Sequence, residues 1–168
     1  MIRKNGNFLR STLPLALMTL AALMASGCSK KQKPDEISPS TDMGESSTAG
    51  DSDSGRALGL VTIRFPYDSF VLNDSAKEAL KNNASIMKDK ASLSVQIEGH
   101  CDSRGGVQYN IALGEKRANA VKKYLEGMGI AAERLTTISY GKERLLESAE
   151  TEEAHGKNRR ANFVITSK

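Results

Sequence analysis

The stretch from 93 to 128 most constrains this chain, because it joins a strand, a glycine-rich turn and a long helix without interruption. Apolar and polar residues alternate through 93–97, which is typical of a half-buried strand. A polar turn with two consecutive glycines follows at 102–106. From residue 107 the apolar residues recur at helical spacing and share one face of the predicted helix. That face carries Gly114, Ala118, Val121, Tyr124, Leu125 and Met128.

Two polar residues, Asn110 and Arg117, fall on this apolar face. A charged guanidinium directed at a core is costly unless another group pairs with it. Arg117 either has an internal partner, such as Asp102 or Asp68, or lines a small polar pocket together with Asp102 where the strand ends. The second arrangement offers one cation and one anion, which suits a zwitterionic ligand.

The adjacent residues His100, Cys101 and Asp102 provide a base, a thiol and a carboxylate, but not in a catalytic arrangement. Neighbours in an extended chain point to opposite sides, whereas a nucleophile and its base must lie within hydrogen-bond distance. His100, Asp102 and His155 lack the spacing of metal ligands, and no phosphate-binding loop is present. We expect a protein without catalytic residues, metal or cofactor, in which Cys101 fills a small buried space.

Residues 1–27 have the features of a secretory signal peptide. Three basic residues make the start positive, and a largely apolar run follows at 13–25. Small residues precede Cys28, and this ending resembles a bacterial lipobox, which implies that Cys28 is acylated and becomes the new N-terminus. Several acyl chains make a durable anchor, since each buried methylene contributes about 0.8 kcal/mol. An ordinary signal for soluble secretion is the alternative.

The charge balance gives no support to nucleic-acid binding. The whole chain has 24 basic and 20 acidic residues, but the part after residue 27 has 21 and 20, a net charge of +1. Residues 28–57 are rich in Ser, Asp, Gly and Thr and contain too few apolar side chains to form a core. We expect them to form a disordered tether that starts at the lipidated Cys28 and spans about 30 Å on average.

Residues 58–168 are long enough for one domain with one core. The pattern predicts strands at 60–65, 93–97, 135–140 and 163–165, and helices from a capping box at Ser75 and Glu78 and over the stretch beginning at 107. Residues 141–157 are weakly periodic, with room for one helical turn. This order predicts an α+β fold of two layers, with the helices on one face of a mixed four-stranded sheet. The strand order cannot be read from the pattern.

Four ordered motifs between Leu60 and Val164 carry a resemblance to a known family. These motifs are Gly99-His100-Cys101-Asp102, the stretch from Tyr109 to Leu113, the stretch from Arg117 to Leu125, and Asn158-Arg159-Arg160. In this respect the chain resembles the OmpA-like peptidoglycan-binding domain, and most closely the lipid-anchored branch of that family.

The resemblance implies non-covalent binding of peptidoglycan through the diaminopimelate of its stem peptides. It assigns Asp102 to the ligand ammonium and Arg117 to the ligand carboxylate. It also places Tyr67 and Asp68 beside the pocket, and Gly99, Asn110 and Leu113 in its wall.

The same resemblance implies a protein anchored in the outer membrane through Cys28, with its domain in the periplasm. Its implied partners are TolB and other Tol proteins, and its implied role is to support envelope integrity and cell division. An envelope module that mainly recruits other proteins is the alternative function. An enzyme acting on wall peptides is a third class, for which the sequence offers no nucleophile.

Overall fold

The computed structural model describes residues 50–168, so the predicted signal peptide, Cys28 and residues 29–49 of the predicted tether lie outside the described residues. Within that range no helix combines the length and the apolar character that a membrane crossing requires. The elements, in chain order, are β1 (Ile63–Arg64), α1 (Asp74–Asp89), β2 (Ser94–His100), α2 (Val107–Gly127), the 3-10 helix η1 (Ala132–Arg134), β3 (Leu135–Gly141), α3 (Glu152–Asn158) and β4 (Arg160–Ser167).

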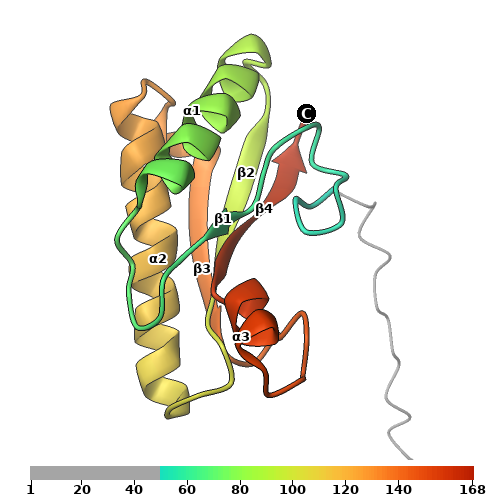
Figure 1. Cartoon of the computed structure of the whole chain (residues 1–168). Helices are drawn as coiled ribbons and strands as arrows, with labels where there is room; N and C mark the ends of the chain where they lie inside the picture. Colours follow the sequence, from blue (N-terminus) through green and yellow to red (C-terminus); the bar gives the residue numbers. More distant parts are fainter. Residues whose placement is uncertain (1–49) are drawn as a thin grey trace, which may run out of the picture. The chain divides into compact units, whose positions relative to one another are not determined.

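The four strands form one mixed sheet in the order β1-β4-β2-β3. β2 runs parallel to β3, and β4 runs antiparallel to both β2 and β1. Helices α1 and α2 cover one face of this sheet (Figure 1), which confirms the predicted two-layer α+β fold. The short α3 lies at the end of the sheet where β2 ends and β4 begins (Figure 1).

The apolar core fills the space between this face of the sheet and the two long helices. Alternate residues of β2 and β4 point into it, because successive side chains of a strand lie on opposite faces. The fully buried contributors include Leu80, Met87, Val95, Ile97, Val121, Leu125, Phe163 and Ile165. The apolar face predicted for α2 is therefore the face that packs on the sheet.

Two glycines let α2 cross β2 at very short range. A Cβ added to Gly99 would lie 1.9 Å from the carbonyl oxygen of Gly114, and one added to Gly114 would lie 2.3 Å from Ser139 Oγ. No side chain fits at either position. The close crossing places the middle of α2 directly above the end of β2, where the polar residues of both elements meet.

The ends of two elements differ from the prediction. Helix α1 begins after Asn73, whose side-chain oxygen accepts a hydrogen bond from the Ala76 N–H at 2.8 Å, so Asn73 and not Ser75 is the N-cap. The first strand covers Ile63–Arg64 and not 60–65. Asn83 on α1 takes up both polar groups of the Val61 backbone, each at 2.8 Å, and so replaces a strand neighbour there.

Residues 50–57 pack on the domain, so the predicted boundary at Leu58 is too late. Asp51 forms a β-bridge with Val164, and the Ser52 N–H donates to the Phe163 carbonyl oxygen at 2.9 Å. Ala57 is fully buried in the core. The composition of this segment is polar, and hydrogen bonds to the edge of β4 supply much of what holds it.

A buried ion pair fixes the same segment to β4. Arg160 Nε lies 2.7 Å from Asp53 Oδ2, and the side chains of both residues are nearly inaccessible. The Ser52 hydroxyl donates to the Asn162 side chain, which in turn donates to Glu98 on β2. These contacts lie on the sheet face opposite the long helices, where polar side chains of β2 and β4 need partners.

We expect Asp53→Asn to lower the free energy of unfolding by about 3 kcal/mol, because it leaves the buried Arg160 charge without its counterion. Urea unfolding followed by circular dichroism measures this loss. Asp89→Asn, an exposed change of the same chemistry at the end of α1, is the matched control and should shift stability by less than about 0.5 kcal/mol. Equal stability of the two variants would contradict a structural role for residues 50–57.

Candidate functional site

A small pocket of about 60 Å³ opens at the C-terminal end of β2, between the turn that follows this strand, the first half of α2 and the loop after β1. It is lined by Tyr67, Asp68, Cys101, Asp102, Arg104, Gly105, Tyr109, Asn110, Leu113, Arg117 and Arg159. Six of the seven residues predicted for a pocket are in this set. The residues come together although the chain separates the first from the last by about ninety positions.

Gly99, the seventh predicted pocket residue, does not line the pocket. It lies within β2, three positions before Asp102, against Gly114 of α2, where a side chain would collide with backbone. The motif glycine therefore serves the helix–sheet contact and not the pocket wall. Its influence on the site is indirect, through the position of α2.

Arg117 is fully buried, and its partners are backbone carbonyls and the Cys101 sulfur, not the carboxylates that one of the two sequence alternatives named. Its guanidinium donates to the carbonyl oxygens of Ser69 at 2.9 Å, His100 at 2.8 Å and Pro66 at 3.2 Å. Within residues 50–168 no ion pair joins Arg117 to Asp102 or Asp68. Burial lowers the pKa of Arg117, since the charged form loses hydration.

Asp102 is buried as well, and two arginines pair with it. Arg104 bonds to Asp102 through Nε and Nη2, and Arg159 Nη1 lies 3.2 Å from Asp102 Oδ2. Burial alone would raise the pKa of the Asp102 carboxyl, but the hydrogen bonds and charges of Arg104 and Arg159 outweigh it and lower the pKa. Asp102 is therefore an anion at neutral pH.

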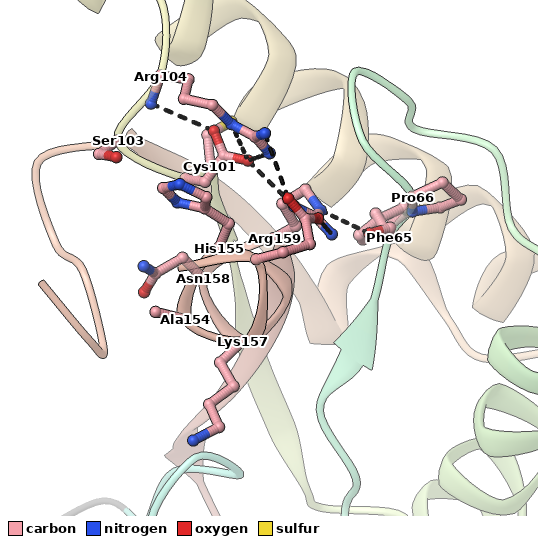
Figure 2. Close-up of polar contacts among 12 residues, drawn as sticks. Phe65, Pro66, Cys101, Ser103, Arg104, Ala154, His155, Lys157, Asn158 and Arg159 are labelled. Carbon is pink, nitrogen blue, oxygen red and sulfur yellow. Dashed lines mark hydrogen bonds and ion pairs between the residues drawn. The ribbon is translucent and has the colours of Figure 1, made fainter. Parts of the chain in front are cut away.

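Arg104, Tyr109 and Arg159 line the pocket although the sequence did not single them out as pocket residues, and Arg159 belongs to the quoted motif Asn158-Arg159-Arg160. It follows α3, and its Nε donates to the Phe65 carbonyl oxygen at 3.3 Å while Nη2 lies 2.8 Å from Glu152. Figure 2 shows Arg159 between the loop at Phe65 and Pro66 and the turn that carries Arg104. Its place in that motif was the signal available from the sequence.

The remaining lining residues hold the shape of the pocket. The Asn110 side-chain nitrogen donates to the carbonyl oxygens of Arg104 at 2.7 Å and Gly106 at 3.1 Å, so this buried amide folds the turn back onto α2. The Tyr109 hydroxyl donates to Asp68, which adopts a left-handed backbone conformation with φ of 48°. The polar residue Asn110 on the apolar face of α2 is thus explained by the turn.

The site is built to bind charge and has no catalytic arrangement. Cys101 is buried, its thiol donates to the Asn110 carbonyl oxygen at 3.3 Å, and burial raises its pKa. His100 Nε2 lies 3.4 Å from Glu98 on the same strand and does not pair with the thiol. Among residues 50–168 no three His, Cys, Asp or Glu side chains gather in a way that could hold a metal ion.

Comparison with known proteins fits this geometry. Residues 64–159 match the OmpA family over most of the domain, including every residue that lines the pocket. The chain belongs to the OmpA family. The match begins at Arg64 in β1 and ends at Arg159, so the family pattern and the observed site cover the same part of the chain.

Several relatives carry one name. The chain is 37% identical over 158 residues to the peptidoglycan-associated lipoprotein of Pseudomonas aeruginosa, covering 88% of this chain and 94% of that protein. It is 33% identical over 153 residues to the protein of the same name from Brucella melitensis, covering 90% of this chain and 91% of that protein. Neither is named as an enzyme, which agrees with the expected absence of catalysis.

Solved structures agree with the fold. The crystal structure of the peptidoglycan-associated lipoprotein from Burkholderia pseudomallei superposes with a TM-score of 0.62 at 32% identity, covering 67% of this chain and 96% of that one. The C-terminal domain of Helicobacter pylori MotB has a TM-score of 0.61 at 20% identity and covers 66% of this chain and 87% of that one. The second likeness concerns the fold alone.

We expect Arg117→Lys to lower the free energy of unfolding by about 2–4 kcal/mol. One ammonium cannot reach all three carbonyls that the planar guanidinium spans, so buried acceptors lose their donors. Urea unfolding measures the loss, and Arg56→Lys at an exposed position is the control. A loss below about 0.5 kcal/mol would contradict the role of Arg117 as the support of the 66–69 loop.

Proposed function

We propose that this protein is an outer-membrane lipoprotein that binds peptidoglycan non-covalently through the diaminopimelate of stem peptides. Its domain faces the periplasm, the lipidated Cys28 holds it in the inner leaflet, and the polar segment after Cys28 gives it reach toward the wall. In this role it tethers the outer membrane to the cell wall. TolB and other Tol proteins are the proposed partners, in a Tol–Pal system that supports envelope integrity and cell division.

The charges of the pocket are the observation that carries this proposal. One buried carboxylate, Asp102, lies near two buried guanidiniums, Arg117 and Arg159, in a pocket large enough for a small polar group. The free end of diaminopimelate carries one ammonium and one carboxylate on the same carbon. Complementary charges at close range favour such a group, since the buried site screens them less than water does.

The hydrogen bonds that Arg117 makes within the protein determine how many donors it has left for a ligand carboxylate. A guanidinium has five N–H donors, and four contacts, including one to Cys101 Sγ at 3.4 Å, use Nε, both Nη1 hydrogens and one Nη2 hydrogen. One donor and the positive charge are left for a ligand carboxylate. Arg117 therefore holds a ligand carboxylate by one hydrogen bond and Coulomb attraction, supplemented by Arg159.

An exposed apolar strip supports the second candidate function, that of an envelope protein-interaction module. Tyr67, Phe70 and Val71, in the loop after β1, are 61%, 44% and 64% exposed. Tyr67 also lines the pocket, so a protein bound to this strip would lie across the mouth of the pocket. Exposed apolar groups clustered in one loop are typical of a protein contact.

We expect folded Asp102→Asn to lose binding to purified diaminopimelate-type sacculi. The change keeps the shape of the side chain and removes its negative charge, which should cost about 2–5 kcal/mol of binding free energy. Co-sedimentation with sacculi measures the loss, and a circular dichroism melt of each variant separates it from unfolding. Asp89→Asn is the matched control and should bind as the wild type does.

The same assay distinguishes the two candidate functions. Wild-type protein should prefer diaminopimelate-type wall over lysine-type wall, because lysine lacks the second carboxylate. Equal binding to both walls, or full binding by folded Asp102→Asn, would contradict the pocket assignment. Capture of TolB without any sacculus binding would favour the interaction module.

We expect Cys28→Ser to release the protein from membranes or to leave its signal peptide uncleaved, because serine has no thiol to acylate. Membrane fractionation and the mass of the purified chain measure both outcomes. A variant that still fractionates with the outer membrane as a processed protein would contradict the lipobox assignment. The second cysteine, Cys101, is buried in the domain and does not interfere with the readout.

A further inference from the structure

Four alternating charges close a ring at the mouth of the pocket. Arg104 contacts Asp102 and lies 3.3 Å from Glu152, while Arg159 lies 3.2 Å from Asp102 and 2.8 Å from the same Glu152. The ring joins the turn after β2 to both ends of α3. Asp102 is its buried member, and the Glu152 side chain, 62% exposed, is its outer one.

The two arginines of the ring are held very differently. Arg159 is 9% exposed and is tied to the backbone at Phe65. The Arg104 side chain is 36% exposed, extends from a glycine-rich turn, and stacks 4.2 Å from the centroid of the exposed Tyr67 ring. In Figure 2 the Arg104 side chain extends from that turn toward the contacts that also involve Arg159. Of the two arginines of the ring, Arg104 is therefore the one that can move at lower cost.

We propose that Arg104 is an internal cation that occupies the ammonium position of the pocket and that a ligand ammonium must displace it from Asp102. This inference rests on the proposed function and deepens it. When Arg104 leaves Asp102, Glu152 and the Tyr67 ring remain within reach and retain its charge near the surface. Arg104 is in this sense a specificity-determining residue.

The competition acts on one end of the ligand and not on the other. A ligand ammonium needs Asp102, which Arg104 occupies, whereas a ligand carboxylate is attracted by Arg117 and Arg159, which do not depend on Arg104 leaving. Removing Arg104 should therefore strengthen the binding of zwitterions, because the bound state no longer competes with an internal pair. It should not strengthen the binding of a dicarboxylate, and the lost positive charge weakens it slightly.

The test compares two probes of equal carbon chain, meso-diaminopimelate and pimelate, by calorimetry on the full chain purified in detergent. We expect Arg104→Gln to bind diaminopimelate about three- to tenfold more tightly than the wild type does, and pimelate equally or more weakly. The affinity of Arg104→Lys for diaminopimelate should lie between those of the wild type and Arg104→Gln, since the lysine ammonium restores part of the competition. Arg56→Gln, an exposed change outside the pocket, should equal the wild type for both probes.

Weaker or unchanged diaminopimelate binding by folded Arg104→Gln would overturn the inference, because Arg104 would then contact the ligand or play no part. Tighter binding of both probes would also overturn it, since a general opening of the pocket would explain that result. Failure of the proposed function is seen separately: wild-type protein would not bind diaminopimelate or sacculi at all. A wild type that binds, together with an Arg104→Gln that gains nothing, rejects the inference and leaves the proposed function in place.

Discussion

The guanidinium of Arg117 joins three segments that the chain keeps far apart. It donates to the loop after β1 at Pro66 and Ser69 and to the end of β2 at His100, while its own backbone belongs to α2. A buried cation held by carbonyl dipoles is tolerated because each dipole points its negative end at the charge. The position of the 66–69 loop, and with it the pocket wall formed by Tyr67 and Asp68, depends on this residue. Arg117 is thus a structural support of the pocket.

The opposite face of the sheet is organised by a second buried charge. Arg160 on β4 pairs with Asp53, and the neighbouring polar side chains of Ser52, Asn162 and Glu98 complete a chain of hydrogen bonds to β2. This network lets a segment with few apolar residues pack in one position. A buried arginine therefore lies on each side of the sheet: Arg117, bound to carbonyls, on the helix side, and Arg160, bound to a carboxylate, on the other.

Helical spacing alone was enough to predict that Asn110 and Arg117 point inward, because the period of a helix determines which side chains share a face. The same reasoning could not identify the partners of Arg117, since the carbonyls of Pro66 and Ser69 are backbone groups of a loop about fifty positions earlier. Composition predicts a tether at residues 50–57 because it reports only how many apolar side chains can be buried, whereas hydrogen bonds and the Asp53–Arg160 pair hold this segment. Gly99 was placed in the pocket wall because it lies in the same motif as Asp102, although the close approach of Gly114 explains it.

The electrostatics of the pocket are unequal for the two charges of a zwitterion. Arg117 has no paired carboxylate within residues 50–168, so an arriving carboxylate meets a cation whose charge is little screened. Asp102 is paired on both sides, so an arriving ammonium gains less from it than from a free carboxylate. If the pocket binds a zwitterion, as proposed, the ligand carboxylate gains more from Arg117 than the ligand ammonium gains from the already paired Asp102. A ligand that carries both charges at a short separation can offset the weaker contact of its ammonium with the stronger contact of its carboxylate.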